Sequence, residues 1–366
     1  MKKYAYNEIT FMQYTLFIHG SQVGIGILQL PHQLAEYAGT DGWISIIIGW
    51  VLSVIASLFL VQVMKKHPED TLIDLLPRYF GVWAGKAFTL FLALYFGFLA
   101  YTVICRAILF ISSWILPQTA DYMLMILFCV PSYLVVRNGL RIQGRYSELV
   151  FFISLWMPLF YLVPLKDAHW HYLLPLVKDG WGPVLHTASF TIYSFLGFET
   201  AFFLYPFLQK KESATLGIVI ANTMSMLVFL FVTISCFVFF SPEGILQFNE
   251  PTLNILKVVE LSFLERLEIV YLAFYLFIIS TTWMPYMFWA VFCSSQLLGK
   301  QNHHRHLVVF LLLSIAGTIG FKLTFDKNDK WQQLLGNVGL LIAFALPVAL
   351  WLYTGGYRLL KRRRNY

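Results

Sequence analysis

The sequence predicts an all-α integral membrane protein with about ten transmembrane helices, of which the first and the sixth are broken. The composition is the first reason. Of the residues, 58% are hydrophobic and 12% are charged, whereas soluble domains carry about 25% charged residues. The second reason is a series of apolar runs of about twenty residues, the length that crosses a bilayer. The third is that two of these runs are interrupted by glycine and polar residues.

The apolar runs follow one another along the whole chain. Their approximate limits are 9–37, 42–64, 85–115, 119–137, 147–164, 184–209, 213–241, 265–292, 306–323 and 333–355. The third run is long enough to require tilt, and Pro131 and Pro158 should kink the fourth and fifth helices. We therefore expect one transmembrane domain, 1–366, with repeats at about 9–164 and 184–355 and a basic cytoplasmic tail at 356–366.

The lysines and arginines between the runs predict the orientation. If the N-terminus is cytoplasmic, inside segments carry 18 of the 26 lysines and arginines and outside segments carry 7, with Arg106 left inside a span. Cytoplasmic loops of membrane proteins carry the excess of positive charge, so both termini should be cytoplasmic. The net charge of +7 then reports orientation and contact with anionic lipid rather than a nucleic-acid partner.

The first run is interrupted by HGSQVGIGILQLP, from His19 to Pro31. Gly20, Gly24 and Gly26 favour unwinding, because each glycine costs about 1 kcal/mol relative to alanine in a helix interior. Unwound backbone at membrane depth must be buried in protein or line a watery cavity. We expect the N–H groups from Val23 to Ile27 to point at one place, which would suit a carboxylate. The alternative is close helix packing through Gly20 and Gly24.

The sixth run repeats this irregularity. SFTIYSFLGFETAFFLYPF has Ser194, Gly197, Glu199 and Thr200 in its middle. One interrupted helix thus opens each set of five, and with five helices per half the halves have opposite orientation, as an inverted repeat requires. Paired interruptions of this kind indicate a transporter-type binding site between the two breaks.

Ionisable residues within the membrane are costly, so each is a functional candidate. Glu199 can bind a ligand ammonium or exchange a proton, or else cap the second half of its helix. Arg106 can snorkel outward, pair with Glu199 or gate the pathway. His19 is either a packing group or a proton carrier, and a lone histidine on an apolar helix favours packing.

The remaining polar clusters could bind an ion or have an ordinary structural role. Ser280, Thr281 and Thr282 can supply oxygens to sodium beside the first break, although hydroxyls in membrane helices usually bond to their own backbone. The cluster His303, His304 and His306 favours a solvated loop over a metal site. No nucleophile–base pair, phosphate loop or zinc signature occurs, so we expect no enzyme, no metal and no cofactor beyond sodium or proton coupling.

Several motifs together resemble one family. SQVGIGILQLP followed by AEYAGTDGWIS, then PRYFGVWAGK, GRYSELVFF, SFLGFE, and ERLEIVYLAFYLF with QLLG, are similar to the B subunits of spore germinant receptors. These belong to the amino acid–polyamine–organocation superfamily. The resemblance covers nearly the whole chain, and it implies a leucine-transporter-type fold with two inverted five-helix repeats.

The resemblance also implies a binding site. In that superfamily the carboxylate of an amino acid meets amides of the first break, which correspond here to Val23, Gly24, Ile25 and Gly26. Its ammonium meets carbonyls of the two breaks, here around His19, Gly20, Tyr193 and Ser194. From predicted depth we add side-chain pocket candidates, namely Tyr101, Phe195, Phe198, Thr281 and Thr282. The fifth span lacks the lysine of some proton-coupled relatives, which leaves Glu199 as the proton candidate.

Two functions remain open from the sequence. The first is the germinant-sensing membrane subunit of a spore receptor, in the inner spore membrane, which binds a small nutrient such as an amino acid. The resemblance implies A and C subunits as partners that read its conformation. The alternative is an amino acid permease coupled to protons or sodium. A scaffold without a ligand would leave the two breaks unexplained.

Overall fold

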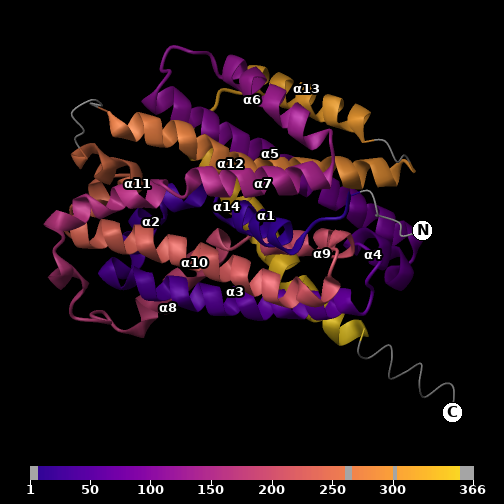
Figure 1. Cartoon of the computed structure of the whole chain (residues 1–366), viewed down its shortest axis with the longest axis horizontal. Helices are drawn as coiled ribbons and strands as arrows, with labels where there is room; N and C mark the ends of the chain where they lie inside the picture. Colours follow the sequence, from indigo (N-terminus) through magenta and orange to yellow (C-terminus); the bar gives the residue numbers. More distant parts are fainter. Residues whose placement is uncertain (1–6, 260–265, 300–302, 355–366) are drawn as a thin grey trace.

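The protein is helical almost throughout (Figure 1). A computed structural model describes residues 7–259, 266–299 and 303–354. Within these ranges the one β-type pairing is an isolated bridge between Ile9 and Leu208. The predicted basic tail at 356–366 lies outside the described residues. The all-α prediction is confirmed.

Each half of the chain opens with an interrupted helix. The first half contains α1 (Phe11–Gln22), α2 (Leu30–Ala38), α3 (Gly42–Lys65), α4 (Leu72–Phe80), α5 (Val82–Trp114), α6 (Asp121–Val136) and α7 (Leu140–Ser154). The second half contains α8 (Trp181–Ser194), α9 (Ala201–Leu204), α10 (Ala214–Phe239), α11 (Pro251–Asn254), α12 (Leu267–Leu297), α13 (His304–Gly320) and α14 (Phe325–Leu340). A π-helical turn, Leu341–Ala345, continues α14.

These helices account for the predicted spans. Among the described residues, six segments are long and apolar enough to cross a membrane, namely Leu30–Lys65, Val82–Trp114, Leu140–Asp167, Lys211–Phe239, Leu267–Leu297 and Phe325–Thr354. The first segment contains α2, which completes the broken helix begun by α1, and α3, which is the second span. With the shorter apolar helices α6 and α13 and the broken helix formed by α8 and α9, the described helices correspond to the ten predicted runs.

Two boundaries differ from the prediction for a local reason. The tenth helix begins at Phe325 rather than near 333, because the Thr324 side chain caps it by accepting from the Lys327 N–H. Its first turns are polar, so the apolar run marks only its later part. At Pro158 the α-helix of span five has already given way to a 3₁₀ segment, Met157–Leu162, whereas α6 continues through Pro131.

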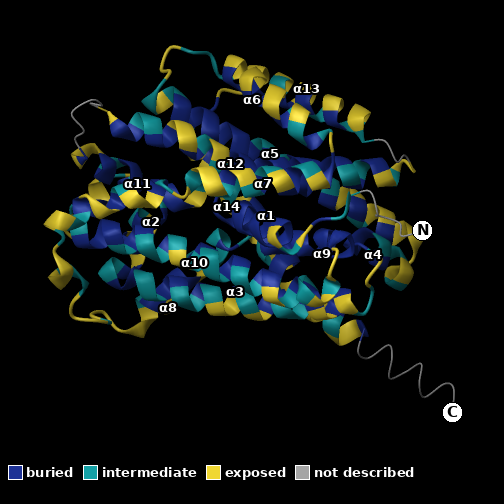
Figure 2. Cartoon of the chain, viewed as in Figure 1, coloured by how far each residue is buried: buried dark blue, intermediate teal, exposed yellow. Residues whose placement is uncertain are grey.

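The helices form two packed groups (Figure 1). In one group α1 contacts α10, α10 contacts α3 and α3 contacts α8, and in the other α5 lies along α12 while α6 pairs with α13. α1 also contacts α7 and α12, so it lies between the groups. Buried residues concentrate in α1 and α12, and exposed residues on the outer helices are often large and apolar (Figure 2). Such a surface suits contact with lipid.

The two broken helices are tied together at one end. The Ile9 N–H donates to the Phe207 carbonyl at 2.9 Å, and the Gln209 N–H donates to the Ile9 carbonyl at 3.1 Å. Thr10 then starts α1 with a reciprocal capping pair to Gln13. The start of the first helix and the end of the sixth are therefore held side by side.

Candidate functional site

The first helix breaks at Val23 and Gly24, inside the predicted stretch. The Val23 N–H donates to the His19 carbonyl and the Gly24 N–H donates to the Gln22 carbonyl, both at 2.9 Å. The chain continues as a 3₁₀ turn, Ile25–Leu28, before α2. Two of the four amides that we expected to receive a carboxylate are thus already bonded within α1. The Ile25 and Gly26 amides begin the turn, where a helix has no internal acceptor for them.

The second break lies directly against the first. α8 ends at Ser194, and Gly197 has a φ of +133°, a conformation that side chains rarely adopt. A Cβ at Gly197 would lie 2.9 Å from both the Gln22 N and the Ser21 carbonyl carbon. Glycine is therefore required here on two counts, the positive φ and the close approach of the two backbones.

Glu199 is fully buried and holds the second break. Its Oε2 accepts from the Gly197 N–H at 2.6 Å, and its Oε1 accepts from the Tyr286 hydroxyl of α12 at 2.8 Å. The carboxyl group therefore caps the turn after the break and links it to α12, which is the capping role considered from the sequence. A ligand or proton role for Glu199 stays a prediction.

Arg106 pairs with Asp329 and not with Glu199, so one of the three roles considered from the sequence is excluded. Its Nε donates to Asn328 Oδ1 at 2.8 Å, and its Nη2 forms an ion pair with Asp329. The guanidinium is 1% exposed and Asp329 is 55% exposed, so the charge is neutralised from α14 at the edge of the bundle rather than by snorkelling. The polar start of α14 is the signal that sequence reasoning missed, because it falls before the apolar run.

His19 belongs to a buried polar network that sequence reasoning also missed. Gln22 Nε2 donates to the Phe195 carbonyl at 2.9 Å and to Asn222 Oδ1 at 2.7 Å. The Ser225 hydroxyl donates to Gln22 Oε1 at 2.7 Å, and His19 Nδ1 lies 2.9 Å from Ser225 Oγ. The network joins α1, α10 and the end of α8. Its signal was the pair of polar residues, three positions apart, on the apolar seventh span.

Hydroxyls of α12 bond directly to the first break. Thr281 and Thr282 donate to the Gly20 carbonyl at 3.2 and 3.0 Å, and the Tyr275 hydroxyl donates to the Gly24 carbonyl. Ser280 contacts the Tyr146 hydroxyl of α7 at 2.6 Å instead. As considered from the sequence, Ser280 and Thr281 also bond to their own helix, at the Phe277 and Ile278 carbonyls, both at 2.6 Å. The bonds to Gly20 and Gly24 hold α12 against the break, and they gather oxygen atoms of the kind that hard cations bind.

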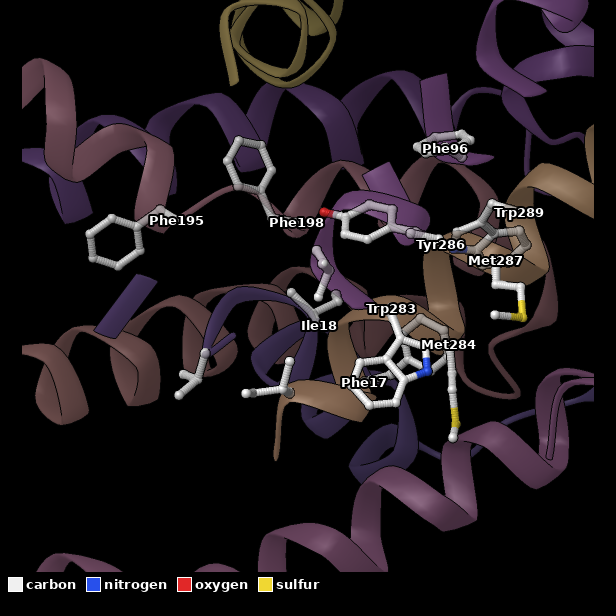
Figure 3. Close-up of a cluster of buried hydrophobic side chains, with 14 of the residues drawn as sticks. Phe17, Ile18, Phe96, Phe195, Phe198, Trp283, Met284, Tyr286, Met287 and Trp289 are labelled. Carbon is white, nitrogen blue, oxygen red and sulfur yellow. The ribbon is translucent and has the colours of Figure 1, made fainter. Parts of the chain in front are cut away.

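The predicted ligand-binding residues fall into two sets. Gly26 is exposed, and Ile25, Tyr193 and Ser194 are half-buried. These residues share one side of the breaks, where a Cβ at Gly26 would lie 3.8 Å from Ser194 Oγ. The others at the breaks are buried, namely Gly20, Val23, Gly24, Phe195, Phe198, Thr281 and Thr282. Figure 3 shows Phe195 and Phe198 within the buried aromatic cluster that includes Tyr286.

Tyr101 lies apart from the breaks. Its ring packs against Trp331 of α14 with 6.1 Å between ring centroids, and its hydroxyl would lie 3.2 Å from a Cβ at Gly317 of α13. The structure therefore does not bring Tyr101 together with the other predicted residues, because the register of α5 turns it toward α13 and α14. No group of three or more potential metal ligands of the His, Cys, Asp and Glu types occurs in the described parts of the chain.

Glu250 approaches the second half of the first helix from the segment between α10 and α12. It precedes α11, which contacts the 3₁₀ turn after the first break. Burial raises the pKa of the Glu250 carboxyl above its ordinary value. Arg106, a hydrogen bond to Gln29 and His32 oppose that shift, whereas Asp329 adds to it.

Comparison with known proteins gives the family and the fold. The family model described as "Spore germination protein" matches residues 8–329. Spore germination protein GerQB of Bacillus cereus is 21% identical over 333 residues, which cover 90% of this chain and 91% of that protein. Spore germination protein YndE of Bacillus subtilis is 24% identical over 352 residues, which cover 94% and 95% of the two chains.

Solved structures of transporters share the architecture. MhsT in complex with L-phenylalanine matches with a TM-score of 0.64 and 14% identity, covering 91% of this chain and 87% of that one. Mhp1, a nucleobase-cation-symport-1 family transporter in a closed conformation with bromovinylhydantoin bound, matches with a TM-score of 0.65 and 12% identity. That match covers 99% of this chain and 81% of Mhp1. The leucine-transporter-type fold is therefore confirmed.

We predict that Glu199 and Tyr286 stabilise the fold as a unit. Glu199→Ala leaves a buried N–H and a buried hydroxyl unpaired, which should cost about 1–3 kcal/mol for each group. Tyr286→Phe should destabilise as well, and the double variant should lose less than the sum of the two, by about 1 kcal/mol. Free energies of unfolding of the purified chain measure this. Tyr37→Phe, at a 44% exposed position, is the control, and additive losses would refute the link.

We predict that Glu250 makes stability depend on pH. Because its folded pKa lies above its unfolded value, it stabilises the fold most below the unfolded pKa and loses that contribution as pH rises through the folded pKa. Glu250→Gln should therefore be more stable than wild type near neutral pH and equal to it in acid. Thermal unfolding midpoints across pH 4–8 measure the difference, and parallel curves for the two proteins would contradict the prediction.

Proposed function

The chain belongs to the spore germination protein family, and from this membership we propose that it is the germinant-sensing membrane subunit of a spore nutrient receptor. The multi-pass helical architecture places it in a membrane, and we assign it to the inner membrane of the spore with both termini cytoplasmic. Its proposed partners are a small nutrient, receptor A and C subunits, and the surrounding lipid.

The observation that carries the proposal is the exposed side of the two breaks. Gly26 is exposed in the middle of a helical bundle, and it faces Ser194 across the breaks. The Ile25 and Gly26 amides have no acceptor among the described residues, and they start a half-helix whose dipole favours an anion. The carbonyls at Tyr193 and Ser194 end α8, where the dipole favours a cation.

An amino acid fits this pair of helix ends. Its carboxylate would meet the amides of Ile25 and Gly26, and its ammonium would meet the end of α8. This arrangement keeps part of the predicted site but shifts it, because Val23 and Gly24 already use their N–H groups within α1. Two similar structures are described with small molecules bound, L-phenylalanine in one and bromovinylhydantoin in the other.

Sensing requires that the nutrient prefer one conformation over another. A ligand with equal affinity for both states shifts nothing. Here the breaks contact each other through Gly197 and Gln22. A molecule inserted between Gly26 and Ser194 would move the breaks apart, and partner subunits would respond to that displacement.

The alternative function is an amino acid permease coupled to sodium or protons. A specific feature favours it, namely the Gly20 carbonyl beside the hydroxyls of Thr281 and Thr282, an oxygen set that suits sodium. One similar structure is described as a Na⁺-coupled sialic acid symporter. Glu199 would be the proton group if protons were coupled instead. Uptake of radiolabelled amino acids into liposomes, with and without a sodium gradient, distinguishes transport from sensing.

We predict different outcomes for two glycine substitutions at the first break. Gly26→Val should leave the protein folded, since the nearest atom to its Cβ is 3.8 Å away, and should weaken the response to one class of nutrient at least tenfold. Gly24→Val should reduce the amount of protein, because its Cβ would lie 2.7 Å from Thr282 Oγ1. Dipicolinate release from spores, tested with single nutrients, and immunoblots of spore membranes measure the two effects.

Gly182→Val is the matched control, because nothing lies within 4 Å of a Cβ at that position. It should leave both the response and the amount of protein unchanged. A wild-type dose–response in Gly26→Val spores with normal amounts of the chain would contradict the proposed nutrient site.

A further inference from the structure

We propose that the cavity on the other side of the first break is a second binding site, for a small, uncharged and mostly apolar molecule with one hydrogen-bond donor. The cavity measures about 120 Å³. It is lined from α1 and its break, from α7 and the 3₁₀ turns after it, from α10 and from α12. None of its lining residues belongs to α5, α8 or α14, so it is separate from the exposed side of the breaks.

The lining excludes an ionic ligand. None of the residues around the cavity is an aspartate, glutamate, lysine or arginine. A charged group placed there would lose its hydration without gaining a partner, which is costly. An apolar cavity of about 150 Å³ binds benzene in another protein, so a single aromatic ring is about the largest molecule that this cavity can hold.

The hydroxyls around the cavity are already bonded. Thr281 donates to the Gly20 and Ile278 carbonyls, and Tyr275 donates to the Gly24 carbonyl. The other pairs are Ser147 with the Gln143 carbonyl, Ser154 with the Phe151 carbonyl, and Tyr161 with both Tyr271 and the Thr252 carbonyl. A ligand therefore finds no hydroxyl here that lacks a partner, and the histidine becomes the polar group to consider.

The buried network fixes the tautomer of His19. Gln22 uses its Nε2 to donate twice, so its Oε1 can accept the Ser225 hydroxyl proton. Because the single Ser225 hydroxyl proton goes to Gln22 Oε1 or to the Ala221 carbonyl, Ser225 Oγ accepts from His19, which places the proton of the neutral imidazole on Nδ1. His19 Nε2 is left as an acceptor without a partner among the described residues, on a ring that lines the cavity. A mostly apolar molecule with one O–H or N–H group could donate a hydrogen bond to this nitrogen.

A molecule bound in the cavity would affect how the helices around it pack. The cavity lies between α1 and α10 on one side and α12 on the other, beside the bonds from α12 to Gly20. Its rim includes Leu155, which is 52% exposed, so the bilayer-facing surface gives access to it. An occupant would favour the packing of the two groups that forms the cavity, and would oppose motions that close it.

Thermal unfolding of the purified full-length chain in detergent tests the proposal, with phenol and toluene as probes. The two molecules have similar size and differ in the single hydroxyl donor. Phenol should stabilise the wild-type chain at a concentration about fivefold lower than toluene, the effect of one net hydrogen bond. His19→Phe keeps an aromatic ring and removes the acceptor, so the two probes should become equivalent in that variant.

Variants that fill the cavity with a larger side chain provide the second part of the experiment. Val150→Phe from α7, or Val228→Phe from α10 if the first variant does not fold, should abolish stabilisation by both probes. Val309→Phe, at a 55% exposed position of α13, is the matched control and should behave as wild type. Equal effects of phenol and toluene on the wild type, or undiminished stabilisation of a filled variant, would overturn the proposal. The test requires no nutrient response, so its result is independent of the proposed sensing function.

Discussion

Backbone groups freed inside a bilayer must find partners within the protein, and this constraint shapes the whole centre of the molecule. At the first break α1 bonds the Val23 and Gly24 amides itself, which leaves the Ile25 and Gly26 amides for a ligand, and hydroxyls from α12 bond the carbonyls of Gly20 and Gly24. At the second break Glu199 accepts the Gly197 N–H, and Gln22 donates to the Phe195 carbonyl. The Glu199 carboxyl and the Gln22 side-chain amide are therefore buried because they bond backbone groups that the second break leaves without a helical partner.

The same constraint makes the two sides of the first break chemically different. On the side of α8, the Gly26 amide and the end of α8 present opposite partial charges, and the backbone there is exposed. On the side of α7 and α10, the lining is apolar and His19 provides an acceptor. A zwitterion suits the first side and an uncharged molecule suits the second. Both sides adjoin the bonds between α12 and the first break, so a molecule on either side affects the same contacts.

Much of this could be predicted from sequence, because glycine clusters and apolar length are local signals. The span count and both breaks followed from them, whereas the family followed from the resemblance of several motifs spread along the chain. The partners of Arg106 and His19 could not, since Asn328 and Ser225 lie far away in the chain and only packing brings them close. Tyr101 was misplaced for a related reason, as depth along a helix does not give the direction of a side chain. The use of the Val23 amide within α1 likewise depends on how the helix ends.

A cross-link between the breaks tests most directly whether a nutrient must move them apart. Gly26→Cys and Ser194→Cys together place two thiols across the exposed side, where a Cβ at Gly26 lies 3.8 Å from Ser194 Oγ. Spores carrying both substitutions should release no dipicolinate in response to nutrient while oxidised. After reduction they should regain the response of the two single variants, which should be insensitive to oxidant. A full response from spores whose chain is demonstrably cross-linked would show that the breaks need not separate, and would contradict the proposed sensing mechanism.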